Sequence, residues 1–115
     1  MRRKTKALYF YSDLYHQGFY FLSKWSREQV AKDFSVEMEH SRAITFVHKG
    51  FIYIWIDSPC EEPVDCLVHE CVHAANFVLG SRGVGVSAKD DEAQAYLVQW
   101  VFANCFNTLN RNLKK

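Results

Sequence analysis

The sequence predicts one α+β domain, in which helices pack on one face of a small, mostly antiparallel sheet. Short β-branched and aromatic runs dominate up to about position 56, whereas apolar residues recur at helical spacing from position 64 onward. The chain has 115 residues, of which 49% are apolar, and this is enough for one compact core. We therefore expect residues 1–115 to form a single domain with the strands first and two main helices last.

Strand character is concentrated in the first half of the chain. Four segments share it, namely Leu8–Tyr11, Phe19–Leu22, Ala43–Val47 and Phe51–Ile56. His48, Lys49 and Gly50 separate the last two segments, which predicts a hairpin with glycine at the turn. We expect this hairpin to form the centre of the sheet.

Two helices are predicted between the strands and the middle of the chain. Ser26 is followed three residues later by Gln29, a capping-box pattern that opens a short helix ending at about Phe34. Apolar residues then recur at helical spacing over Val64–Leu79, and Gly80 follows as the expected C-terminal stop.

A third helix is predicted near the C-terminus. Ser87 and Asp90 form a second capping-box pattern, which opens a long helix over about Ala88–Asn107. The glycine-containing loop before it is long enough for this helix to turn back against the preceding one.

Charge and hydropathy exclude several classes of function. The chain carries 14 Lys and Arg against 13 Asp and Glu, so its formal charge of +1 favours neither nucleic acid nor an acidic membrane surface. Phe51–Ile56 contains no Lys or Arg to accompany its aromatic residues, as a nucleic-acid surface would need. No signal peptide or membrane span is predicted. We expect a cytoplasmic protein with neither nucleic-acid nor membrane partners.

The pattern His69-Glu70-x-x-His73 lies inside the second predicted helix. Residues four apart on a helix share one face, so both imidazoles can reach a single metal ion. Glu70 lies one residue round the helix, close enough to bind a metal-bound water without ligating the metal. The alternative is a helix with two incidental histidines on its polar side.

A hydrolytic zinc site needs three protein ligands and one open position. Glu92 lies 19 residues beyond His73, in the first turn of the third predicted helix, and is the expected third ligand of one zinc ion per chain. Asp91 is the substitute. Asp90 is assigned to the capping box, and acidic residues in a first turn also complement the helix dipole.

The four cysteines are read as thiols because nothing indicates an oxidising setting. Cys66 lies three residues before His69 on the same helix face, so it is either a packing residue or a metal ligand. Cys60 could pair with Cys66 only under oxidation. Cys71 and Cys105 are expected in the core.

These residues resemble the gluzincin branch of zinc metallopeptidases. Glu92–Leu97 is similar to the Glu-Ala-x-x-aromatic segment of the compact ImmA/IrrE-type members, and the chain resembles small metallopeptidases encoded by phages and prophages. The resemblance covers roughly residues 58–100. It implies a minimal zincin-like fold with zinc on His69, His73 and Glu92. Thermolysin-like enzymes carry an Asp four residues after the ligating Glu, where this chain has Tyr96.

The resemblance implies a zinc-dependent peptide-bond hydrolase in which Glu70 acts as general base on zinc-activated water. The oxyanion needs a further donor, and Tyr96, one turn past Glu92, is the nearest candidate. His40, His48 and Arg82 are the other candidates.

The expected partner is a peptide or protein substrate, which the Ala43–Ile56 hairpin could bind along its edge. The alternative is a phage virion, assembly or regulatory binding protein that keeps the zincin fold with a structural zinc. The expected location is then the cytoplasm of the host cell, or the virion.

Overall fold

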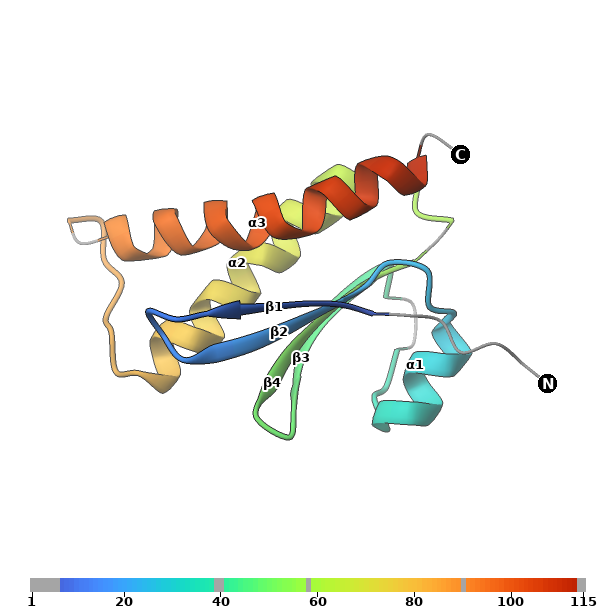
Figure 1. The fold of residues 1–115 in the computed structure, drawn as a ribbon, viewed down its shortest axis with the longest axis horizontal. Helices are drawn as coiled ribbons and strands as arrows, with labels where there is room; N and C mark the ends of the chain where they lie inside the picture. Colours follow the sequence, from blue (N-terminus) through green and yellow to red (C-terminus); the bar gives the residue numbers. More distant parts are fainter. Residues whose placement is uncertain (1–6, 39–40, 58, 90, 114–115) are drawn as a thin grey trace.

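The computed structural model describes residues 7–38, 41–57, 59–89 and 91–113. These residues form a four-stranded sheet and three helices, which Figure 1 labels in chain order. The elements are β1 (Leu8–Ser12), β2 (Gln17–Leu22), α1 (Arg27–Phe34), β3 (Ala43–His48), β4 (Phe51–Ile56), α2 (Pro63–Ser81) and α3 (Glu92–Leu113). The predicted α+β class is confirmed.

The sheet is mixed, with the strand order β1-β2-β4-β3. β1 and β2 pair antiparallel, as do β3 and β4, whereas β2 and β4 pair parallel. The predicted hairpin of β3 and β4 is confirmed, but only β4 is central. β3 lies at the edge of the sheet, because β4 rather than β3 pairs with β2.

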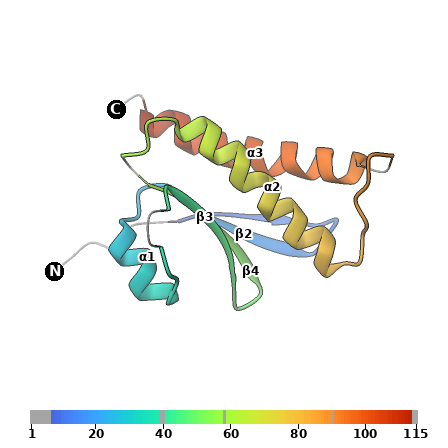
Figure 2. The same cartoon turned by 180° about the vertical axis from the view of Figure 1, so that it is seen from behind.

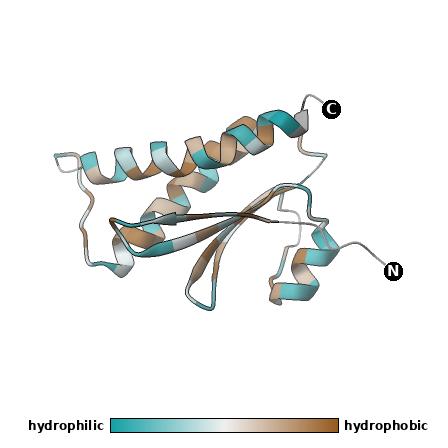
Figure 3. Cartoon of the chain, in the orientation of Figure 1, coloured by the Kyte–Doolittle hydropathy of each residue, from teal (hydrophilic) through white to brown (hydrophobic). Residues whose placement is uncertain are grey.

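α2 and α3 lie side by side over one face of the sheet (Figures 1 and 2). α2 packs on β3 and β4, and α3 contacts β1. Alternate residues of β4, Ile52, Ile54 and Ile56, point into this main core with Leu67 and Val101 from the helices. Figure 3 shows that hydrophilic residues prevail towards the C-terminal end of α3.

The other face of the sheet carries a second core, which includes α1. Leu22 and Trp55 from the strands pack there with Trp25 and Val30. The Ser26 side chain caps α1 by accepting a hydrogen bond from the Gln29 backbone N–H, 3.1 Å away, which confirms Ser26 as the N-cap of this helix. The helices therefore do not all lie on one face, since α1 covers one end of the other.

α2 ends at Ser81, two residues later than the sequence indicates, and Gly80 lies inside it. The stop is Gly83, which follows the C-cap residue Arg82 and has a φ of 71°. The N–H of Val84 bonds to the carbonyl of Leu79, and the N–H of Gly83 bonds to the carbonyl of Gly80. This is a Schellman motif, which glycine favours because the left-handed conformation strains other residues.

α3 spans Glu92–Leu113 rather than Ala88–Asn107. The expected start at Ala88 is wrong, because Ala88 and Lys89 are not helical and the helix begins at Glu92. Asp90, the second half of the expected capping box, lies outside the described residues. Within the described ranges, no helix is long and apolar enough to span a membrane.

Candidate metal centre

His69 and His73 lie on the side of α2 that faces solvent, one helical turn apart. Leu67, Cys71 and Ala74 are fully buried against the core and fix which way the helix faces. The two imidazoles converge, with 3.1 Å between their Nε2 atoms and 4.8 Å between their ring centroids. The spacing of four residues therefore brings both rings to one point.

This separation suits a shared zinc ion. Two nitrogens bound to tetrahedral zinc at about 2.05 Å lie about 3.3 Å apart. The same separation also suits an N–H···N hydrogen bond between the rings. Neutral imidazoles are good zinc ligands, and both rings are exposed to solvent, from which an ion can enter.

Glu70 is the buried member of the motif, with 6% of its surface exposed. Its Oε1 accepts a hydrogen bond of 2.6 Å from the hydroxyl of Thr45. The same hydroxyl lies 3.1 Å from the Glu70 carbonyl oxygen. Thr45 belongs to β3, so this contact joins the motif helix to the edge strand of the sheet.

Thr45 is a site residue that sequence reasoning missed. Ile44 and Phe46 pack in the second core, so strand alternation turns Thr45 towards the face that α2 covers. That much could have been predicted from the pattern of β3. Which residue of α2 it meets depends on how the helix docks on the sheet, which the sequence pattern does not specify.

Glu92 is exposed at the first residue of α3, and the structure does not bring it to the histidine pair. The side of α3 that faces α2 is marked by Gln94, whose amide donates to the Asn76 Oδ1 at 2.7 Å. Residues two apart on a helix point about 160° away from each other, so Glu92 faces away from Asn76. Among the described residues, no three His, Cys, Asp or Glu side chains are grouped to hold a metal.

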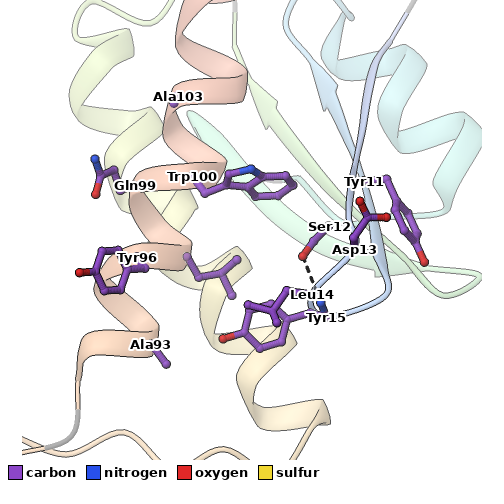
Figure 4. Close-up of a pocket in the computed structure, with 11 residues that line it drawn as sticks. Tyr11, Ser12, Asp13, Leu14, Tyr15, Ala93, Tyr96, Gln99, Trp100 and Ala103 are labelled. Atoms are coloured by element: carbon purple, nitrogen blue, oxygen red, sulfur yellow. Dashed lines mark hydrogen bonds between the residues drawn. The ribbon is translucent and has the colours of Figure 1, made fainter.

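Tyr96, the expected oxyanion donor, is 68% exposed on α3. It lines an open cavity of about 890 Å³ between α3 and the turn that joins β1 to β2 (Figure 4). The cavity is lined by residues 11–15, 93, 96, 97, 99, 100 and 103, and neither His69 nor His73 is among them. The structure therefore does not place Tyr96 with the histidine pair.

The other expected donors have different surroundings. The Arg82 guanidinium donates to the carbonyl oxygens of Tyr15 and His16, and so ties the end of α2 to the turn between β1 and β2. The His48 ring packs edge-on against Phe34, with 5.1 Å between ring centroids. His40 lies outside the described residues.

The cysteines form two groups. Cys71 and Cys105 are fully buried, which confirms that they are core residues. Burial raises the pKa of the Cys71 thiol to about 12. Cys60 and Cys66 are half-buried with their sulfurs 3.1 Å apart, and Cys66 packs against the core, as expected of a packing residue.

Comparison of the chain with protein-family models, with curated proteins and with solved structures gives no match.

Proposed function

We propose that this chain is a zinc-dependent peptide-bond hydrolase that holds one zinc ion through His69 and His73. The observation that carries this proposal is the convergence of the two Nε2 atoms to 3.1 Å on the helix that also presents Glu70. The motif's resemblance to compact gluzincins, including small phage-encoded members, gives the proposal its reaction class.

Bound zinc would act as a Lewis acid and lower the pKa of water towards neutrality. Glu70 would take the proton of the attacking water and pass it to the leaving amine. Thr45 would orient Glu70, because its hydroxyl donates to the carboxylate that does this work. Glu70 is the catalytic residue in this scheme and Thr45 is a positioning residue.

The proposed substrate is a peptide in extended conformation. β3 is an edge strand, so one side of its backbone is available to pair with a further strand. Thr45 of β3 touches Glu70, and a peptide added to this edge would pass close to the general base. This supports the expected use of the hairpin edge for substrate binding.

Glu92 is the proposed third ligand, and reaching the histidines requires the first turn of α3 to move. Residues 85–89, which lie beyond the Schellman motif and the Arg82 contacts, are all exposed, so this part of the connection can adjust without opening the core. We expect Glu92→Ala to weaken zinc binding by at least about tenfold, because loss of even an outer-shell partner of a metal ligand costs about 10–100-fold in affinity. Asp91→Ala is the matched control, and the reverse ranking would assign the ligand to Asp91.

The test of hydrolysis is cleavage of a mixed peptide library or an unfolded protein by the zinc-loaded chain and by Glu70→Gln. The glutamine fits the same space, and its amide oxygen can still accept from Thr45. We expect the wild type to cleave and Glu70→Gln to lose roughly 10²–10⁴-fold in rate, the usual worth of a general base. Equal cleavage by both proteins would refute the role of Glu70.

The second candidate is a virion, assembly or regulatory binding protein with a structural zinc. One contact favours it: the hydrogen bond from Thr45 gives Glu70 a packing role that a structural protein would also use. A domain of this size also gains stability from a metal cross-link. This candidate predicts zinc that raises the melting temperature, with no cleavage by either protein.

A further inference from the structure

Cys60 and Cys66 meet where the chain passes from the sheet into the motif helix. Cys60 lies in the connection between β4 and α2, and Cys66 lies in the first turn of α2. Their sulfurs are 3.1 Å apart. The backbone holds both ends in place, because the N–H of Cys60 bonds to the carbonyl of Asp57 and the N–H of Cys66 bonds to the carbonyl of Glu62.

We propose that Cys60 and Cys66 are a reversible oxidation site, at which a peroxide joins the two thiols in an intramolecular disulfide. The sulfurs need to approach by only about 1 Å to reach the disulfide bond length. Both residues are half-buried rather than sealed in the core, so a small oxidant can reach them. This inference does not depend on zinc or on the proposed hydrolysis.

The other thiols leave the choice of pair unambiguous. Cys71 and Cys105 have no exposed surface and sit inside the main core. Both thiols are sealed away from solvent, so a peroxide in solution does not reach them. Oxidation is therefore directed to the pair at the start of α2.

The chemistry takes two steps. The thiolate of Cys60 attacks one oxygen of hydrogen peroxide and the O–O bond breaks, which gives a sulfenic acid and hydroxide. The hydroxide takes up the proton that the Cys60 thiol had released and leaves as water. The sulfur of Cys66 then attacks the sulfenic sulfur, its proton leaves with the hydroxyl as a second water, and the disulfide forms. Overall, two thiols are oxidised and one hydrogen peroxide is reduced to two waters. A dithiol reductant reverses the reaction.

The order of these steps follows from the surroundings of Cys66. Burial, and the neighbouring Cys60 thiol, raise the pKa of Cys66 to about 11, so this thiol stays protonated near neutral pH. A protonated thiol is a poor nucleophile towards a peroxide in solution, which assigns the first attack to Cys60. The second attack is intramolecular, and the 3.1 Å between the two sulfurs favours it, so the less reactive Cys66 takes the resolving role.

The disulfide would fix the connection after β4 to the first turn of α2. Cys66 is three residues before His69, so the cross-link would lie one helical turn from the proposed metal pair. A closed loop this short restrains the unfolded chain modestly, so we expect the oxidised protein to melt at a slightly higher temperature than the reduced one.

The test uses the full chain, freed of metal by a chelator, reduced, and treated with one equivalent of hydrogen peroxide. Peptide mapping by mass spectrometry should find Cys60 linked to Cys66 with the loss of two hydrogens, and dithiothreitol should restore both thiols. In Cys66→Ser, which keeps the attacking residue, dimedone should trap a sulfenic acid on Cys60. Cys105→Ala is the control that keeps the pair and should cross-link like the wild type.

Two results would overturn the proposal. One is a wild type in which both cysteines remain thiols under conditions that oxidise glutathione. The other is a wild type in which Cys60 or Cys66 is overoxidised or joined to a second chain without forming the internal link. Because metal is absent throughout, neither result bears on zinc-dependent hydrolysis.

Discussion

A single hydrogen bond between Thr45 and Glu70 joins the motif helix to the edge of the sheet. Glu70 could be identified from the sequence because its place inside the HExxH pattern defines its chemistry. Thr45 could not, because its partner is 25 residues away and depends on tertiary packing. Local patterns thus identify a candidate site residue better than they identify the distant residue that contacts it.

Replacing Thr45 separates the hydroxyl from the shape of the side chain. Thr45→Val keeps the volume but leaves the buried Glu70 carboxylate without its donor, so we expect a loss of about 1–3 kcal/mol in the free energy of unfolding. Thr45→Ser keeps the donor and should lose less. Chemical denaturation near pH 7 measures both. Equal losses in the two variants would show that the hydrogen bond contributes nothing.

The buried Cys71 thiol should make the free energy of unfolding fall at alkaline pH. Burial raises the pKa of this thiol from 9.0 to about 12, so between these values the unfolded chain releases a proton that the folded chain keeps. The unfolded state then binds fewer protons, and the free energy of unfolding falls as pH rises, by up to about 1.4 kcal/mol per pH unit for this group.

Denaturation curves of the wild type and of Cys71→Ala at several pH values from about 8 to about 11 test this linkage. As pH rises, the free energy of unfolding of the wild type should fall relative to that of Cys71→Ala. A difference that stays constant across this range would contradict the shifted pKa of Cys71.

At the level of elements, α2 shows what sequence patterns predict well and where they fail. The helical period and the two histidines locate the helix and its solvent-facing side, both as found. The sequence pattern misplaces its end because three glycines, Gly80, Gly83 and Gly85, follow the last apolar residues, and only the backbone conformation shows that Gly83 is the stop. The start of α3 was misplaced because a capping pattern alone does not require the chain to be helical there.

The two glycines at the end of α2 form a matched pair for testing this boundary. Gly80 is helical and a Cβ there would meet no neighbour, so Gly80→Ala should raise the free energy of unfolding by about 0.5–1 kcal/mol. Gly83 has a φ of 71°, so Gly83→Ala should lower it by about 1 kcal/mol. Thermal or chemical unfolding measures both changes. The opposite order would place the helix stop at Gly80.

At the level of the whole molecule, the fold class could be predicted, but the order of the strands could not. Periodicity identifies strands and helices along the chain. The pairing of β2 with β4 joins segments that α1 and β3 separate in the sequence, and local patterns do not predict such a long-range contact. That pairing leaves β3 at the edge of the sheet, with Thr45 in contact with Glu70, which is the feature that the proposed peptide binding depends on. The second core around α1 also depends on packing between distant segments.

The proposed centre was predicted in the same uneven way. His69 and His73 meet because one helix spaces them, and helix geometry is local. Glu92 and Tyr96 belong to another helix, so their distance from the histidines depends on the loop and on how α3 packs. The proposed ligation by Glu92 therefore depends on how α3 is placed when zinc is bound.

The most direct measurement is the zinc content of the purified chain beside His73→Ala, Glu70→Gln and His16→Asn. We expect one zinc per chain in the wild type, and the same in Glu70→Gln, which keeps both histidines. His73→Ala, which removes an exposed ligand from α2, should lose the metal. His16→Asn, which removes an exposed histidine from the turn between β1 and β2, should keep it.

Zinc at about 100 times its dissociation constant should also stabilise the wild type by about 2.7 kcal/mol, and His73→Ala should gain nothing. A wild type that takes up no zinc, or a His73→Ala variant that still holds one zinc per chain, would contradict the assigned metal centre.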